Sequence, residues 1–179
     1  MRPNWFIALP VPGGEWFEML GPPPPSIRAF SASDLHLTIA FLGTVSESAA
    51  HAAWAAFAWP LGDVDVTLGD VVPMGRPTRY SALSALLDEG REAVEAAMGA
   101  SRDAAYLAAG VAPDLRPPKA HVTLGRPQRS ATLSQREAAL VWAQALRLRD
   151  VRVRLGAPAL YTWAEDRSRA LFRIVTTRP

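Results

Sequence analysis

Residues 36–43 of this 179-residue chain read H-L-T-I-A-F-L-G, and residues 121–127 read H-V-T-L-G-R-P. Both stretches are predicted to be β-strands, the first ended by Gly43 and the second closed by Pro127. Successive side chains of a strand point to opposite faces, so a His and a Thr two positions apart share a face. Each strand therefore presents one imidazole and one hydroxyl side by side.

Chance is a poor explanation for two such motifs. The chain has three His and nine Thr, so a given His has Thr two positions later with a probability of about 0.05, and two of three do so about once in a hundred cases. The motifs lie 85 residues apart, close to half the chain, which is the spacing that an ancient duplication leaves. We therefore predict two similar lobes that face each other across a groove.

Two imidazoles that face one groove are candidates for a general acid and a general base. A His side chain has a pKa of about 6.5, so at neutral pH one imidazole of the pair can be protonated while the other is neutral. The hydroxyls of Thr38 and Thr123 can donate to phosphoryl oxygens, and Arg126, five residues after His121, can pair bidentately with an anion. These residues indicate in-line phosphodiester cleavage that needs no metal.

Other interpretations of the same residues stay open. A two-His metal site is one, although no third ligand is patterned nearby and Asp34, which shares the parity of His36, fits the preceding turn better. Histidines that only recognise phosphate would make a binding module, and His–Thr pairs that bond across a lobe interface would be structural. The third histidine, His51, lies in A-A-H-A-A-W, fits a helix surface and is left out of the site.

The remaining segments predict an α+β fold, in which strands are both adjacent and separated by helices. Proline-rich residues 21–25 are expected to form a loop, with a proline-recognition ligand as the alternative. The Ala-rich segments favour two helices, and Ser134 with Glu137 has the capping-box spacing that begins a third, running to about residue 148. The helices are expected at 47–59, 91–109 and 134–148, and the other strands at 4–9, 27–30, 64–72, 79–87, 151–155 and 169–177.

Composition and charge narrow the function classes. The chain has no Cys, which excludes disulfide scaffolds, zinc–thiolate sites and cysteine nucleophiles, and it has no Gly-rich phosphate loop. No apolar run reaches roughly 18 residues and the N-terminal W-F-I-A-L-P is too short for an export signal, so we expect a soluble cytoplasmic protein. Residues 1–115 carry a local charge of −7 and residues 116–179 one of +9. The basic half suits an anionic ligand or is a solvated arginine-rich surface.

The paired motifs resemble the H-x-T-x motifs of the two-histidine (2H) phosphoesterases, and most closely those of the bacterial LigT/ThpR branch, the RNA 2′,3′-cyclic phosphodiesterases. The resemblance extends over essentially the whole chain, from the opening W-F-I-A-L-P segment to the late L-Y segment at Tyr161. One departure is Ala120, because this branch usually has Pro before the second histidine. The nearby Pro117 and Pro118 can supply the same rigidity.

The resemblance implies a single bilobal catalytic domain over residues 1–179. Two pseudo-twofold-related lobes would line a central groove with antiparallel sheets and carry their helices outside. It implies hydrolysis of a 2′,3′-cyclic phosphate end, on RNA or a cyclic nucleotide, to a 2′-phosphate without metal or cofactor. The reverse reaction, 2′–5′ RNA ligation, becomes available in the same site. We further expect a monomer that does not associate with membranes.

The resemblance also assigns roles by motif position. His36 would be the acid that protonates the departing 3′ oxygen, and His121 the base that activates water. Thr38, Thr123 and Arg126 would hold the phosphate. A further aromatic residue, Phe41, would contact the nucleoside, although strict strand alternation puts it on the face away from His36. Phe41 therefore reaches the groove only if the strand bends or ends there.

Overall fold

A computed structural model describes residues 2–178 and contains nine strands, four α-helices and one 3-10 helix. The strands are β1 (Trp5–Pro10), β2 (Ile27–Ala29), β3 (His36–Gly43), β4 (Val64–Arg76), β5 (Arg79–Leu87), β6 (His121–Pro127), β7 (Arg152–Leu155), β8 (Ala159–Trp163) and β9 (Phe172–Thr177). The α-helices are α1 (Gly14–Glu18), α2 (Glu47–Ala56), α3 (Arg91–Ala109) and α4 (Leu133–Ala145), and the 3-10 helix spans Ala32–Asp34.

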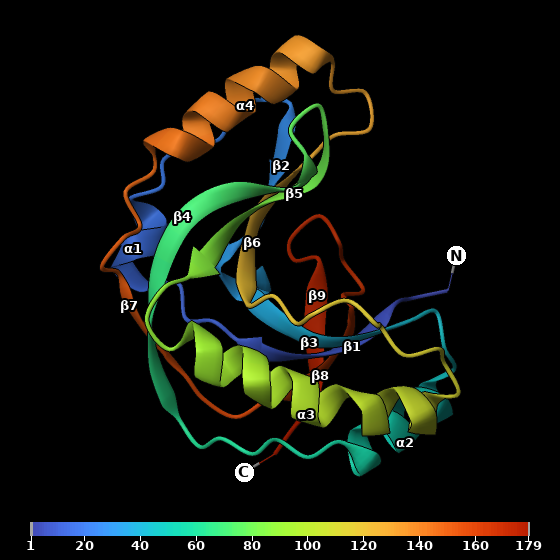
Figure 1. The fold of residues 1–179 in the computed structure, drawn as a ribbon. Helices are drawn as coiled ribbons and strands as arrows, with labels where there is room; N and C mark the ends of the chain where they lie inside the picture. The colour runs from blue at the N-terminus through green and yellow to red at the C-terminus, as the bar shows by residue number, and fades with distance from the viewer. Residues whose placement is uncertain (1, 179) are drawn as a thin grey trace.

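The strands form two antiparallel sheets, which confirms the α+β class. One sheet has the order β3-β1-β8-β9 and the other β2-β6-β5-β4-β7. Helices α2 and α3 pack beneath the first sheet, and α4 lies along β4 on the outside of the second (Figure 1). The helices therefore cover outer faces, as expected, and leave the sheets to line the space between the lobes.

One apolar core reaches across both sheets. Fully buried side chains join it from the first sheet, the second sheet and α3, for example Leu37, Leu83 and Val94. Burial of each such side chain contributes about 1.5–3 kcal/mol, so the shared core holds the two sheets in a fixed relation. A separate small cluster of Phe6, Ala8, Ala159 and Tyr161 lies on the other face of the first sheet.

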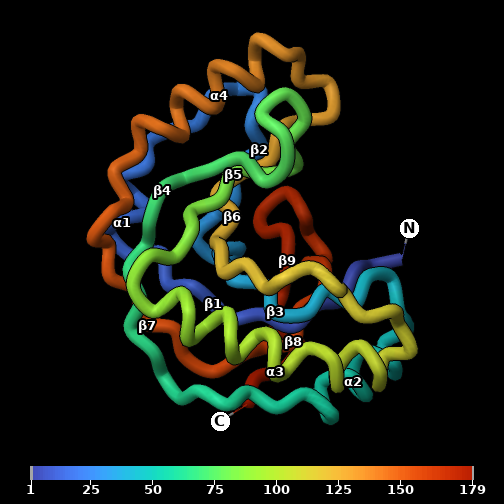
Figure 2. Tube along the Cα trace, viewed as in Figure 1, coloured from blue at the N-terminus to red at the C-terminus, as the bar shows by residue number. Residues whose placement is uncertain are grey.

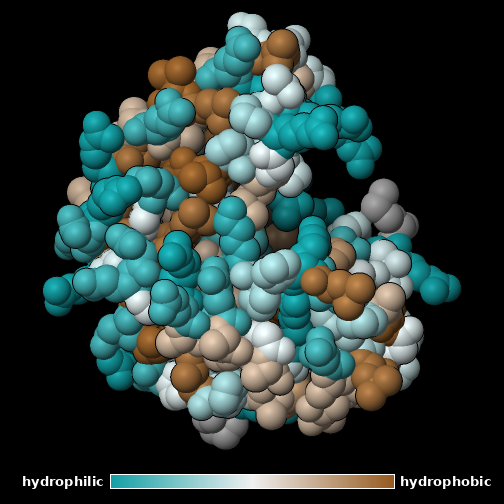
Figure 3. Space-filling view, in the orientation of Figure 1, coloured by the Kyte–Doolittle hydropathy of each residue, from teal (hydrophilic) through white to brown (hydrophobic). Residues whose placement is uncertain are grey.

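The two motif strands meet although they belong to different sheets. β3 is an edge strand paired with β1, whereas β6 lies between β2 and β5. β3 and β6 nevertheless contact each other, and the loop between β8 and β9 rises beside β6 (Figure 2). In the space-filling view this side of the molecule is hollowed between the segment that follows β6 and the first sheet (Figure 3). The sequence motifs therefore open onto a common groove.

Two elements, α1 and β8, escape prediction from the sequence. Helix α1 spans five residues, too few to show a helical period. Strand β8 is buried at four of its five positions, so its sequence lacks the alternation that marks a half-solvated strand. Both elements are consequences of tertiary packing.

The capping box predicted at Ser134 is wrong, because the N-cap of α4 is Thr132, two residues earlier. Thr132 Oγ1 accepts a hydrogen bond from the backbone N–H of Gln135 at 3.3 Å, and Gln135 Oε1 accepts one from Thr132 at 2.9 Å. The sequence contains the capping-box spacing at both places, as T-x-x-Q from Thr132 and as S-x-x-E from Ser134. The first turn is held where it is by Arg136, whose side chain donates to the carbonyl of Tyr80 while its own carbonyl accepts from the Tyr80 hydroxyl.

Candidate active site

The two motif histidines are held in the same way. Nδ1 of His36 lies 2.6 Å from the carbonyl oxygen of Asp34, and Nδ1 of His121 lies 2.7 Å from that of Lys119. In both cases the carbonyl belongs to the residue two positions earlier. A carbonyl only accepts, so each Nδ1 carries the proton and each Nε2 is left to exchange protons with a ligand. This shared geometry suits a pair that works as acid and base.

A β-bulge in β3 corrects the expected position of Phe41. Thr38 pairs with Ala8 and Ala40 pairs with Ile7, so Ile39 is an extra residue without a partner on β1. An extra residue reverses the alternation beyond it. Phe41 accordingly pairs with Phe6, which contacts the His36 ring, and the expectation of strict alternation is wrong here. Phe41 is 54% exposed on the His36 face of the strand.

The second motif strand contains an equivalent bulge. Thr123 pairs with Ser84 and Gly125 with Leu83, so Leu124 is the extra residue. Each bulge lies three residues after the histidine of its strand. It brings the residue that lies five places after that histidine onto the same face as the histidine. In β6 that residue is Arg126. The two motifs therefore share a backbone irregularity as well as a tripeptide.

The two threonines differ in their surroundings. Thr38 is half-buried beside His36, whereas Thr123 is buried and its hydroxyl lies 3.2 Å from Ser84 Oγ. Ser84 is fully buried in the neighbouring strand. Its hydroxyl therefore orients that of Thr123, a supporting contact that the motif by itself does not predict.

Aromatic rings surround His36. Ring centroids lie 4.8 Å away for Phe6, 5.2 Å for Phe172 and 5.6 Å for Tyr161, with Phe30 at 6.2 Å. His36 is only 8% exposed, and this burial lowers the pKa of its imidazole to about 4. The positive charge of Arg126 lowers that pKa further, while the carbonyl of Asp34 opposes the shift.

Burial also lowers the pKa of His121, and the charges of Lys119 and Arg126 add to that effect. Partial desolvation lowers the pKa of Arg126 as well, although much of its side chain is exposed. In the free site both imidazoles are therefore neutral at pH 7 beside the positive charge of Arg126. An anion that enters the groove would raise both histidine pKa values.

Asp34 ties His36 to the loop that joins β8 and β9. Its Oδ1 accepts from the backbone N–H groups of Leu171 at 2.7 Å and Phe172 at 3.1 Å, while its Oδ2 accepts from the Ser31 hydroxyl at 2.7 Å. Its own carbonyl is the one that holds His36. The turn expected at Asp34 is confirmed, and this buried side chain connects the turn to the far end of the chain.

Replacement of Asp34 by Ala is expected to destabilise the fold and weaken the site together. It leaves two backbone donors without their acceptor, which costs about 1–3 kcal/mol for each donor that stays buried. Denaturant unfolding should show that loss. Asp70→Ala, which removes an exposed carboxylate paired with Arg149, is the matched control and should unfold near the wild-type midpoint. Equal unfolding midpoints for Asp34→Ala and wild type would contradict this role.

Other features bear on a metal or a membrane. Among residues 2–178, no three His, Asp or Glu side chains gather in an arrangement that could hold a metal ion. His51 is exposed on α2, 3.9 Å from Glu47, and takes no part in the groove. No helix within the described residues is long and apolar enough to cross a membrane.

Several residues around the site were not predicted. Phe6, Phe30 and Phe172 come from three separate segments, and no local pattern distinguishes them from core residues. Arg28 lies directly opposite Arg126 in the β2–β6 pair. The alternation in I-R-A-F predicted a strand there, but only the pairing shows which strand lies beside it.

Comparisons with known proteins identify the fold. Neither a protein-family model nor a curated protein sequence matches the chain. Escherichia coli LigT complexed with 3′-AMP matches with a TM-score of 0.67 at 21% identity, over 100% of this chain and 97% of that one. TT0787 of Thermus thermophilus matches with a TM-score of 0.65 at 16% identity, over 97% and 96% of the two chains. Kluyveromyces marxianus Usb1 matches with 0.55 at 13% identity, over 89% and 93%. The chain therefore has the LigT-like fold that the motif resemblance implies.

Proposed function

We propose that the protein is a phosphodiesterase that opens a 2′,3′-cyclic phosphate, at an RNA end or on a nucleotide, to a 2′-phosphate. The strongest support for this proposal is the pair of equivalent bulged strands. Each strand holds a histidine by Nδ1 and leaves its Nε2 for proton transfer. The LigT-like fold supports the proposal, since E. coli LigT has been solved with 3′-AMP, ATP, NADP+ and phosphate. Proton transfer and positioned donors carry the reaction without a metal.

In the proposed ring opening, each histidine transfers one proton. His121 Nε2 takes a proton from water as the water oxygen attacks phosphorus in line with the 3′ oxygen. The P–O3′ bond breaks, and the protonated Nε2 of His36 delivers its proton to the leaving oxygen. The products are a 2′-phosphate and a free 3′-hydroxyl. The same ring opening with a 5′-hydroxyl in place of water as the nucleophile would form a 2′–5′ linkage.

The charge on phosphorus is stabilised by donors from both lobes. The hydroxyls of Thr38 and Thr123 donate to the non-bridging oxygens, and Arg126 pairs with the anion. We assign Ser84 as the donor of the 3.2 Å hydroxyl pair, which leaves the Thr123 proton for the phosphate. Phe41, on the histidine face, offers its ring to the nucleoside.

His36 lies on the first sheet and His121 on the second. We propose that residues 1–179 act as one bilobal catalytic domain that needs no second copy of the chain to complete the site, and that the protein is a monomer. RNA ends that carry cyclic phosphates in the cytoplasm are the proposed substrates.

The pH dependence tests the acid–base pair. In the active state one of the two Nε2 atoms carries a proton and the other does not, and the population of this state peaks between the two pKa values of the coupled pair. Because burial lowers both values, that of His36 to about 4, kcat/KM should be bell-shaped with its peak below pH 6.5. The profile of kcat should peak at a higher pH, because bound phosphate raises both values. Adenosine 2′,3′-cyclic phosphate in EDTA is the substrate for this measurement.

His51→Ala is the control for these profiles and should leave both limbs in place, because His51 lies outside the groove. A kcat/KM profile that rises steadily to pH 9 would contradict the assignment. Activity lost in EDTA and restored by a divalent ion would favour the two-His metal site. Salt-sensitive binding without turnover would favour the binding module.

A further inference from the structure

A cavity of about 360 Å³ opens beside the groove. Four arginines line it, namely Arg28, Arg126, Arg129 and Arg167, together with the rings of Phe30 and Phe172. Its volume lies within the range of small-molecule sites, about 300–1,000 Å³. No carboxylate lines the cavity, although residues 2–178 contain many acidic side chains. The charged groups of the lining are therefore all positive, and aromatic rings lie beside them.

The first two arginines form a cross-strand pair of like charge. Arg28 and Arg126 are directly opposite in the antiparallel β2–β6 ladder, so their side chains share a face. Like charges in that position destabilise a sheet. Strands β2 and β6 can lie this close together because residue 125 is glycine. A Cβ there would lie 2.7 Å from Ile27 Cγ2 and 3.1 Å from the Arg28 carbonyl. An anion between the two guanidinium groups would remove the repulsion.

Arg167 reaches the same cavity from the other sheet. It lies in the loop between β8 and β9, which Asp34 anchors at Leu171, and its carbonyl accepts a hydrogen bond of 3.0 Å from Arg28. Its guanidinium stacks 4.2 Å over the Trp163 ring. Its Nε is buried and has no hydrogen-bond partner among the described residues. A buried donor without a partner is costly, and a bound oxygen would satisfy it.

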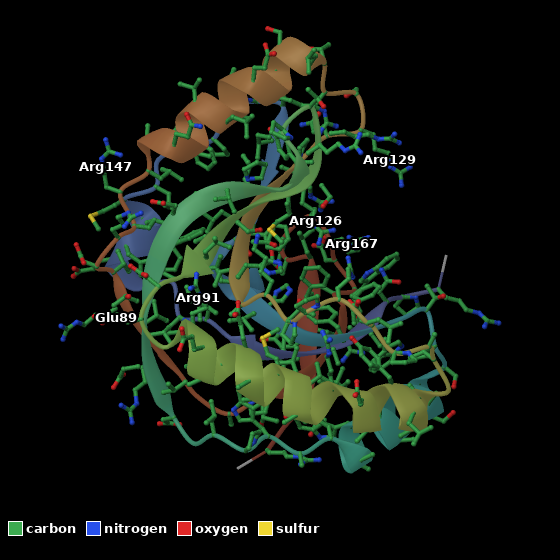
Figure 4. All side chains as sticks on the ribbon, viewed as in Figure 1. Glu89, Arg91, Arg126, Arg129, Arg147 and Arg167 are labelled. Carbon is green, nitrogen blue, oxygen red and sulfur yellow. The ribbon has the colours of Figure 1, made fainter. Side chains whose placement is uncertain are left out.

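The side-chain view places the cavity next to the catalytic groups. Arg126 and Arg167 lie near each other at the centre of the groove and Arg129 lies at its upper end, whereas Arg147 lies on the opposite side of the molecule (Figure 4). Arg126 also lies close enough to His36 to lower the pKa of that residue. Phe30 and Phe172 line the cavity and contact the His36 ring. The cavity and the histidines thus share Arg126 and these two rings.

Four other arginines pair with a carboxylate, namely Arg116, Arg149, Arg154 and Arg169. Arg116 pairs with Asp114 at 2.6 Å, Arg149 with Asp70 at 2.7 Å, and Arg154 with Asp63 at 3.2 Å. None of the four cavity arginines makes an ion pair with a carboxylate within residues 2–178. Their charge is left for a ligand.

We propose that this cavity is a second phosphate site, which binds a phosphate one nucleoside away from the reacting cyclic phosphate. The inference rests on the proposed function and names its substrate class as a cyclic phosphate end that carries a further phosphate. Arg28 and Arg167 hold that phosphate, Arg126 lies between it and the reacting phosphate, and Arg129 attracts it. The rings of Phe30 and Phe172 border the nucleoside between the two phosphates. The second phosphate belongs either to the preceding linkage of an RNA chain or to a 5′-phosphorylated nucleotide.

Three substrates test the proposal. Adenosine 2′,3′-cyclic phosphate lacks the second phosphate, 5′-phosphoadenosine 2′,3′-cyclic phosphate carries it as a monoester, and ApA with a 2′,3′-cyclic end carries it as a diester. We expect kcat/KM for the dinucleotide to exceed that for the mononucleoside about tenfold or more, since hydrogen bonds to charged groups contribute effects of that order. The rank of the 5′-phosphorylated nucleotide tells which source is preferred.

Two variants locate the preference. Arg28→Ala should reduce the ratio of the two kcat/KM values about tenfold. Arg129→Ala should reduce it less, and because Arg129 is exposed, this variant tests the site without risk to folding. Arg147→Ala, an exposed arginine of equal charge on the opposite side, is the control and should keep the wild-type ratio. The salt dependence of KM should also be steeper for the dinucleotide.

The results distinguish failure of the second phosphate site from failure of the proposed phosphodiesterase activity. Turnover of all three substrates at equal kcat/KM, unchanged in Arg28→Ala and Arg129→Ala, would overturn the second phosphate site and leave the phosphodiesterase intact. A preference lost equally in Arg147→Ala would overturn it too, because general charge would then explain the effect. Turnover of none of them would overturn the proposed function itself.

Discussion

Replacement of His36 or His121 by Ala is expected to lower kcat/KM for adenosine 2′,3′-cyclic phosphate about 10²- to 10⁴-fold, the contribution of one general acid or base. Each variant removes the only Nε2 that can exchange a proton on its side of the phosphate. Neither imidazole substitutes for the other, because each is fixed to a carbonyl of its own strand. Initial rates for the wild type and both variants at several pH values measure the loss.

Folding must be checked in the same variants, because His36 is buried among four aromatic rings. Circular dichroism and thermal melting should show a folded protein in both. His51→Ala removes an imidazole from the α2 surface and should keep the wild-type rate. A decrease in kcat/KM of less than tenfold in both motif-histidine variants would contradict the acid–base assignment. A lower Tm with unchanged activity would instead support the structural interpretation.

Replacement of Arg126 by Ala is expected to lower kcat/KM about 10²- to 10³-fold, the usual effect of removing a preorganised donor from a developing anion. Arg126→Lys should recover only part of that loss, because Lys keeps the charge but lacks the planar fork that binds two oxygens. The bulge at Leu124 places Arg126 on the histidine face, and its neighbours in β6, Gly125 and Pro127, have no charged side chain to replace it. Steady-state kinetics on the three proteins measure both effects.

Arg152→Ala is the matched control for Arg126, since Arg152 is also an exposed strand arginine of the second sheet. It should leave kcat/KM near the wild-type value. Full recovery in Arg126→Lys would mean that charge alone is needed at this position. Equal losses in Arg126→Ala and Arg152→Ala would contradict a specific contact with the phosphate.

The two motif strands could be predicted because their information is local. A period of two puts His and Thr on one face, and the repeat at half-chain spacing indicates two lobes. The bulges could not be predicted, since the sequences around Ile39 and Leu124 read as uninterrupted strands and only pairing with β1 and β5 reveals the extra residue. Strict alternation therefore misplaced Phe41.

The surroundings of the site depend on contacts between distant segments. Asp34 reaches Leu171 across 137 residues, and the side chain of Arg28 reaches the carbonyl of Arg167 across 139. Nothing in I-R-A-F or in the loop after β8 indicates that these segments meet beside β6. Charge counting showed a basic half of the chain, but Arg28 belongs to the acidic half and only the β2–β6 pairing brings it to the cavity.

The two-histidine mechanism is best tested by following adenosine 2′,3′-cyclic phosphate by ³¹P NMR in EDTA, with wild type beside the His36→Ala/His121→Ala double variant. Wild type is expected to convert the cyclic signal to that of the 2′-phosphate, and the double variant to leave the cyclic signal unchanged over the same time. A 3′-phosphate product would contradict the proposed bond cleavage. Equal turnover in the double variant, or none in wild type with this substrate and with a cyclic-ended RNA, would contradict the two-histidine mechanism.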